Sequence, residues 1–291
     1  MFFNNVKTAV LLASMSALLL FMGNLFGGST GLNIALIIAL VMNLISYFYS
    51  DKIVLKMYGA TPLDPKEYDW IYKIIEELRT KMNIPMPKLW LVNTPMANAF
   101  ATGRNPAHAS VAVTTGILQI LNKEELRGVL AHELSHVQNR DILVSTVAAT
   151  LATAIGYLAN MLQHMALWGS FSNNSNDQKR GNPIIMVAVA LLMPIAATLI
   201  QLAISRSREY LADETGAHTC HDPLALASAL QKLQNHIPEA HLKNDDAARA
   251  STAPLFIVHP FTANSWIALF STHPPMNERI ARLKAMNEKM F

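Results

Sequence analysis

The chain has 291 residues, of which 52% are hydrophobic and 15% are charged, whereas charged residues make up about 25% of an average soluble domain. This composition favours a membrane protein over a soluble one. The net charge of +3 and the lack of a dense Lys/Arg tract argue against nucleic acid as a partner. Cys220 is the only cysteine, which excludes an intrachain disulfide and a zinc site built from several cysteines.

Charged residues are missing from three long stretches, 8–50, 142–176 and 181–205. A helix of about 20 apolar residues crosses a bilayer, and a charged side chain at its centre is costly. These stretches are therefore predicted to hold the membrane-spanning helices of a mainly α-helical protein.

We predict four transmembrane helices in two hairpins. The first hairpin, residues 1–50, has spans at about 8–26 and 32–50 and a glycine-rich turn between them. The second hairpin, residues 142–204, has spans at about 143–167 and 183–204. A cleaved signal peptide is the competing interpretation of the first span, but no small-residue cleavage site follows it and a second span does.

Residues 51–141 are predicted to form a soluble part with a small sheet. Apolar residues recur at helical spacing over 68–78, which indicates a helix with one buried face. The segments 88–92 and 110–114 are rich in β-branched and apolar residues and are predicted to be short strands, with a loop that contains 98–103 between them.

The second soluble part, residues 205–291, is predicted to contain helices over 223–235 and 277–288. Eleven Lys and Arg residues lie in 51–141, nine in 205–291 and two in 168–182. The excess of positive charge on the cytoplasmic side of membrane proteins places both large parts in the cytoplasm. With four spans, both termini lie on that side.

The motif His132-Glu133-Leu134-Ser135-His136 carries the chemistry. Asn122 and Glu125 form a capping box at the start of a predicted helix that contains it. Two histidines four residues apart on a helix point the same way and can bind one zinc ion, and Glu133 can then accept a proton from the water that zinc acidifies. The same five-residue pattern also occurs by chance in ordinary amphipathic helices.

A catalytic zinc needs a third protein ligand and an open position. The motif helix leads into the third span and Glu209 follows the fourth, so two antiparallel spans bring Glu209 beside His132 and His136. Asp213, four residues further on, can hold a ligand imidazole by its other ring nitrogen, although a solvated acid is nearly as plausible there. His218, Cys220 and His221 form a possible second metal cluster, for which a solvated helix end or loop is the favoured interpretation.

Several segments together carry a family resemblance. They are Asn98 to Gly103 (NAFATG), Ala131 to His136 (AHELSH), Asn139 to Asp141 (NRD), Ser205 to Asp213 (SRSREYLAD), Ser271 to Pro275 (STHPP) and Glu278 to Ile280 (ERI). With these segments the chain resembles the HtpX family of bacterial membrane zinc endopeptidases, which are related to the eukaryotic CAAX prenyl endopeptidases.

The resemblance implies a zincin-like α+β protease domain with one Zn²⁺, held by His132, His136 and Glu209, and Glu133 as general base. It further implies that His273 and Arg279 help to stabilise the oxyanion or to order the site. Substrate is expected to pair as an added strand along Asn98, Ala99, Phe100 and Ala101, although a turn remains an alternative for this segment. Specificity particular to this chain is expected in 168–182 and 237–253.

The resemblance also implies a biological role in the bacterial inner membrane. The expected substrates are misfolded or misassembled membrane proteins and unfolded soluble proteins, and other membrane quality-control proteases are possible partners beside the lipid bilayer. Two other classes stay open. A protease with its zinc at mid-bilayer depth is disfavoured by the charges that flank the motif, and a transporter or scaffold with a structural zinc is disfavoured because only three ligands are found.

Overall fold

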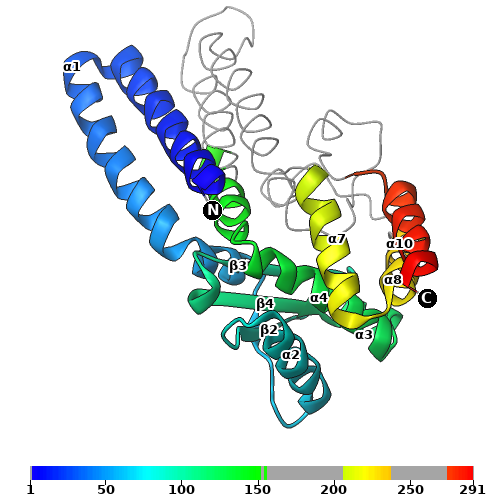
Figure 1. Cartoon of the computed structure of the whole chain (residues 1–291). Helices are drawn as coiled ribbons and strands as arrows, with labels where there is room; N and C mark the ends of the chain where they lie inside the picture. The colour runs from blue at the N-terminus through cyan, green and yellow to red at the C-terminus, as the bar shows by residue number, and fades with distance from the viewer. Residues whose placement is uncertain (1, 152–153, 156–205, 237–273, 291) are drawn as a thin grey trace, which may run out of the picture.

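The computed structural model describes residues 2–151, 154–155, 206–236 and 274–290, which form a helical hairpin beside a domain with a four-stranded sheet (Figure 1). The predicted span 183–204, most of the span 143–167, the segments 168–182 and 237–253, and His273 lie outside the described residues. Among the described residues, the predicted soluble parts 51–141 and 205–291 share one hydrophobic core. Leu126 of the first belongs to the same buried cluster as Ala217 and Leu226 of the second.

The N-terminal hairpin is α1 (Phe2–Met57), two helical arms that meet at Gly28. Gly28 has a φ of 54°, a left-handed conformation that glycine adopts without steric cost. By length and composition both arms, Val6–Asn24 and Gly28–Met57, are long and apolar enough to cross a membrane. The second arm runs past the predicted end at residue 50, because Val54 and Leu55 pack against the sheet and continue the helix.

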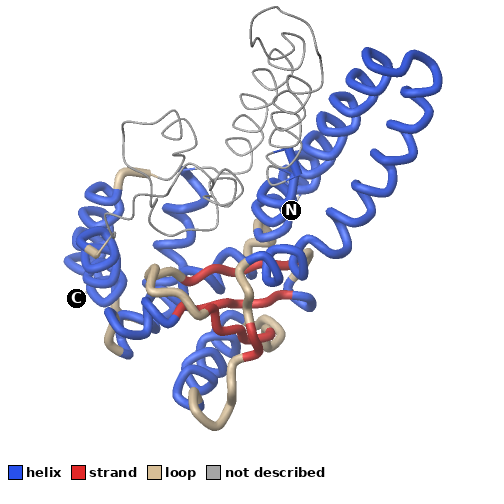
Figure 2. The backbone as a smooth tube through the Cα atoms, turned by 180° about the vertical axis from the view of Figure 1, so that it is seen from behind, coloured by secondary structure: helices blue, strands red, loops and turns tan. Residues whose placement is uncertain are grey.

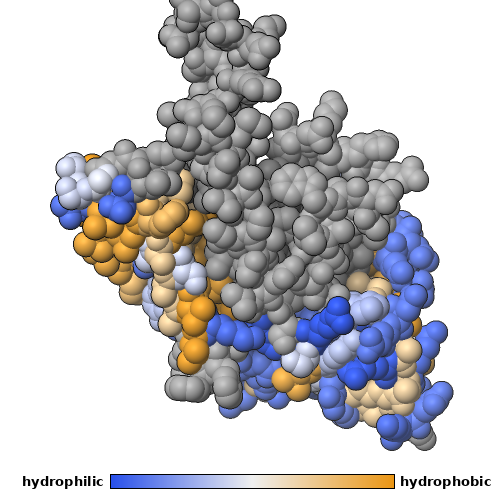
Figure 3. Space-filling view, turned by 90° about the horizontal axis from the view of Figure 1, so that it is seen from above, coloured by the Kyte–Doolittle hydropathy of each residue, from blue (hydrophilic) through white to orange (hydrophobic). Residues whose placement is uncertain are grey.

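The surface of the hairpin is strongly apolar. Large side chains on its second arm are exposed, among them Ile37 at 63% and Leu44 at 60%. Seen from above, apolar residues gather over the hairpin, while hydrophilic residues dominate the described surface on the other side (Figure 3). An exposed apolar surface of this extent is typical of contact with lipid or with another protein.

The sheet has the strand order β1 (Thr61–Pro62), β2 (Lys88–Val92), β4 (Ala109–Thr114) and β3 (Ala99–Gly103). β2 and β4 are parallel, whereas β1 and β3 pair antiparallel with their neighbours. The two predicted strands are confirmed, the second of them one residue longer. The predicted loop over 98–103 is wrong from Ala99 on: Ala99–Gly103 form β3, an edge strand that alanine-rich composition hides because alanine has a low β-propensity.

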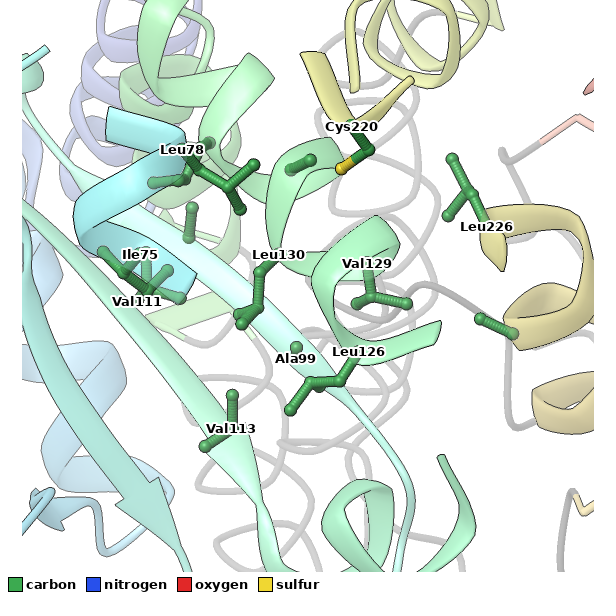
Figure 4. Packing of buried hydrophobic residues seen from close by; sticks show 14 of the residues in the cluster. Ile75, Leu78, Ala99, Val111, Val113, Leu126, Val129, Leu130, Cys220 and Leu226 are labelled. Atoms are coloured by element: carbon green, nitrogen blue, oxygen red, sulfur yellow. The ribbon is translucent and has the colours of Figure 1, made fainter. Parts of the chain in front are cut away.

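Helices cover both faces of the sheet (Figure 2). α2 (Asp69–Met82) and α4 (Lys123–Gln138) pack on one face, where Leu126 and Leu130 of α4 lie toward Ala99 and Val113 (Figure 4). On the other face Phe100 packs with the end of α1 and with Ala149. The alternation of side chains along β3 therefore ties the α4 core to the hairpin.

The remaining elements are α3 (Thr115–Ile120), the short helix η1 (Pro106–His108), the apolar helix Ile142–Leu151, α7 (Arg206–Cys220), α8 (Pro223–Asn235) and α10 (Met276–Met290). The predicted capping box of α4 is confirmed, since Asn122 and Glu125 exchange side-chain to backbone hydrogen bonds. α7 crosses α4 closely at Gly216, where a Cβ atom would lie 2.9 Å from the backbone nitrogen of His132. The absent side chain lets α7 approach the motif.

Candidate active site

His132 and His136 point from one face of α4 to a common point. Their Nε2 atoms lie 3.3 Å apart. Two nitrogens bound to one tetrahedral zinc ion, each at about 2.0 to 2.1 Å, would be separated by roughly this distance. The pair thus has the spacing of two ligands of one ion.

Glu209 of α7 completes the cluster. Its Oε2 is 3.7 Å from His132 Nε2 and its Oε1 is 3.6 Å from His136 Nε2. Within the described residues this is the group of His, Cys, Asp and Glu side chains that could hold a metal, with ligand atoms within 4.8 Å of one another. Two imidazoles and a carboxylate suit zinc.

Glu133 lies beside this cluster and faces the edge of the sheet. Its Oε2 accepts a hydrogen bond from the backbone N–H of Ala101 at 2.9 Å. Burial raises the pKa of the Glu133 carboxyl above its ordinary value, although the neighbouring His132 and His136 act to lower it. A carboxylate with a raised pKa is suited to accept and return a proton near neutral pH.

Asp213 and Arg279 support the site from α7 and α10. Asp213 Oδ1 lies 2.9 Å from His132 Nδ1. Arg279, completely buried, donates two hydrogen bonds to the Asp213 carboxylate, from Nε at 2.8 Å and from Nη2 at 2.7 Å. Its Nη1 is 3.8 Å from Glu209 Oε2. The guanidinium therefore contacts the carboxylate behind one histidine and approaches the Glu209 carboxylate.

Comparisons with known proteins identify the family of the chain. The sequence profile of peptidase family M48 matches residues 65–287. The chain belongs to peptidase family M48. It is 53% identical over 280 residues to a "Protease HtpX homolog" from Syntrophobacter fumaroxidans, which covers 96% of this chain and 98% of that protein. A protein of the same description from Aquifex aeolicus is 48% identical over 98% of this chain and 94% of its own length.

Among solved structures, the crystal structure of S. mikatae Ste24p matches this M48 peptidase with a TM-score of 0.50 and 18% sequence identity. The match covers 97% of this chain and 66% of that one, and this likeness concerns the fold alone. The resemblance to the HtpX family is confirmed by the relatives, and as a member of M48 the chain is a metalloprotease.

One supporting residue of the M48 site was missed from the sequence. Asp141, five residues after His136, lies with Oδ2 3.3 Å from His136 Nδ1. Burial alone lowers the pKa of His136, but the nearby carboxylates, chiefly Asp141, outweigh it and raise that pKa to about 10. The segment Asn139-Arg140-Asp141 could have indicated this residue, because it is one of the segments that carry the family resemblance. No role was assigned to it from the sequence.

The predicted substrate-binding segment lies inside the protein. Asn98, Ala99, Phe100 and Ala101 are all buried, and the Phe100 ring packs against Tyr58 with centroids 5.2 Å apart. Ala99, Phe100 and Ala101 lie in β3 and not in a turn, and Asn98 directly precedes this strand. The Ala101 N–H of β3 binds Glu133.

The second metal cluster considered from the sequence is not assembled among the described residues. His218 and His221 are exposed at the end of α7, but the expectation of a solvated segment is wrong for Cys220. Its side chain is buried against α4, and its sulfur lies 3.7 Å from the Arg127 carbonyl oxygen. Burial raises the pKa of this thiol to about 11, which keeps it protonated.

Proposed function

We propose that this M48 metalloprotease is a zinc endopeptidase in which His132, His136 and Glu209 hold one Zn²⁺ and Glu133 is the general base. The observation that supports this proposal most strongly is the convergence of the three ligand side chains beside the Glu133 carboxylate. Four carboxylates lie in or beside the cluster: Glu209 belongs to it, Asp213 and Asp141 lie against the two histidines, and Glu133 interacts with both of them. Such a site attracts a dication.

A zinc ion bound there would supply Lewis acidity and lower the pKa of a bound water to near 7. Glu133 accepts the proton of the attacking water and passes it to the leaving amine of the cleaved peptide bond. Asp213 and Asp141 orient the two imidazoles through their Nδ1 atoms. Arg279 acts through Asp213 and offsets the negative charge of Glu209, whereas the role of His273 rests on the family resemblance.

The substrates that we propose are misfolded or misassembled membrane proteins and unfolded soluble proteins, bound as an extended strand along β3. Recognition through backbone hydrogen bonds tolerates many sequences, which suits such a task. The hydrogen bond from the Ala101 N–H of β3 to Glu133 supports this mode of binding, because it places the proposed base beside the strand. Contacts with other membrane quality-control proteases belong to the same proposed role.

A metal-restoration experiment tests this function. The protein is purified in detergent, stripped with a chelator and then supplied with zinc, while bound zinc and the cleavage of an unfolded test protein are followed. We expect cleavage to be lost on stripping and regained as about one zinc ion binds per chain. If one zinc binds and neither the unfolded protein nor a reconstituted membrane protein is cut, the proposed function is wrong.

We further propose that the protein spans the bacterial inner membrane four times, with the active site and both termini in the cytoplasm. The apolar surface of α1 and the Lys/Arg distribution support this arrangement. In a Cys220→Ser background, Glu124→Cys and Ser29→Cys place single thiols on α4 and in the α1 turn, where both side chains are exposed. In inside-out vesicles an impermeant maleimide is expected to label the first and not the second. The reverse pattern would contradict the cytoplasmic site.

A further inference from the structure

The backbone N–H and C=O groups of β3 alternate between its partner strand β4 and the other side of β3, where no further strand of the described residues pairs. Thr114 N donates to Asn98 O at 3.0 Å, and Phe100 lies opposite Ala112 in the antiparallel register. In such a ladder only every second residue exchanges backbone hydrogen bonds with its partner. The residues whose backbone groups face away from β4 are Ala99, Ala101 and Gly103.

Two of the three outward N–H groups already bind side chains. The Ala101 N–H donates to Glu133. The Gly103 N–H donates to the hydroxyl of Thr146 at 3.4 Å, and the Thr102 hydroxyl lies 3.0 Å from the same oxygen. Thr146 is completely buried, so the helix Ile142–Leu151 lies against the edge at its Gly103 end.

The hydrogen bonds of the Thr146 hydroxyl define which group donates and which accepts. It donates its one proton to the Ile142 carbonyl oxygen at 2.6 Å, so its oxygen is left to accept from Gly103 N–H and from the Thr102 hydroxyl. A peptide that paired with Gly103 would have to displace both bonds and the buried helix. At Ala99 the outward groups pair with no other strand of the described residues.

We propose that Thr146 determines where strand pairing ends: a bound peptide pairs with β3 at Ala99 and with the carbonyl oxygen of Ala101, whose N–H stays bound to Glu133. It leaves the sheet before Gly103, where Thr146 and its helix cover the edge. This inference rests on the proposed function, in which substrate adds to β3. An antiparallel peptide runs from the Gly103 end toward the Ala99 end. The excluded position is therefore on the amino-terminal side of the bound segment, and Thr146 is a specificity-determining residue for that side.

A backbone scan of a cleavable peptide tests the inference. Each amide in turn is N-methylated, which removes the N–H that would donate to a β3 carbonyl, and kcat/KM is measured with the zinc-loaded protein. Loss of one such bond is expected to lower kcat/KM about three- to tenfold. For the native sequence we expect two sensitive positions, two residues apart, and no effect at the position two residues nearer the amino terminus.

Variants assign the effect to the hydroxyl. Thr146→Ala frees the Gly103 N–H and vacates space, so a third sensitive position is expected. Thr146→Ser keeps the hydroxyl and should match the native profile. Thr150→Ala is the control one turn further along the helix, because the Thr150 hydroxyl donates to the Thr146 carbonyl oxygen and not to β3.

The role of Thr146, strand pairing and the protease function each have a different result that would contradict them. A third sensitive position in the native protein, or an unchanged profile in Thr146→Ala, would overturn the assignment of Thr146. Cleavage without any sensitive position would overturn strand pairing itself while leaving the protease function intact. Failure to cleave any peptide or protein would overturn the proposed function.

Discussion

Replacing Glu133 with glutamine is expected to lower kcat by about two to four orders of magnitude while the protein still binds zinc. The substitution removes the proposed proton acceptor, and general acid–base catalysis typically contributes a factor of about 10² to 10⁴. Glutamine has nearly the same shape and an oxygen that can still accept the Ala101 N–H, so the site should keep its arrangement. Zinc content and cleavage of an unfolded protein are measured on the same preparation.

Glu124→Gln provides the matched control. It removes the same charge from the same helix, but the Glu124 side chain is exposed and does not face the ligand cluster. This variant should cleave at the native rate. A zinc-loaded Glu133→Gln protein that retains more than about a tenth of the native rate would show that another group acts as the base.

Replacing Arg279 with methionine is expected to destabilise the zinc-free protein by about 3 to 5 kcal/mol. The change leaves the Asp213 carboxylate buried without its cation, and breaking one side of a buried ion pair typically has this cost. Thermal unfolding in detergent measures the change. If Arg279→Met unfolds at the native temperature, the ion pair does not contribute to stability as argued.

The effect of Arg279 should depend on pH in a defined direction. Burial alone raises the pKa of Asp213, but the charge and hydrogen bonds of Arg279 outweigh it and hold that pKa below its ordinary value. The stabilisation by this pair is therefore present above about pH 4 and is lost as the pH falls through the lowered pKa of the folded state. The difference between Arg279→Met and the native protein should shrink on acidification.

The double variant Arg279→Met with Asp213→Leu distinguishes stability from metal binding. Replacing both members of a buried ion pair with apolar side chains is often neutral, so unfolding should return toward the native temperature. Zinc affinity should stay about ten- to a hundredfold lower, because His132 has lost the carboxylate at its Nδ1. Native affinity in the double variant would exclude a positioning role for Asp213.

The local elements of this protein were determined by its sequence. The capping box of α4 depends on Asn122 and Glu125, three residues apart, and the spacing of His132 and His136 places both on one helix face. The boundaries of α8 and of β2 were predicted correctly. Helical periodicity, caps and strand propensity act between near neighbours, so they can be recognised without the fold.

The place of the proposed third ligand could also be inferred, because the two charge-free stretches constrain where Glu209 lies relative to the motif. Spacing along the chain brings Glu209 near the motif but does not define which atoms it contacts. Arg279 is 66 residues beyond Asp213, and only the packing of α10 against α7 brings its guanidinium to that carboxylate. From spacing alone, Arg279 would be a charge on a solvated helix.

The edge strand was decided by the tertiary structure. Ala99 to Gly103 have a composition that fits a loop or helix as well as a strand, and pairing with β4 together with cover from α4 selects the strand. The hydrogen bond between Ala101 and Glu133 joins residues 32 positions apart, and the one between Gly103 and Thr146 joins residues 43 positions apart. Such contacts depend on how whole elements pack, because the free energy that selects them comes from burial and not from neighbouring residues.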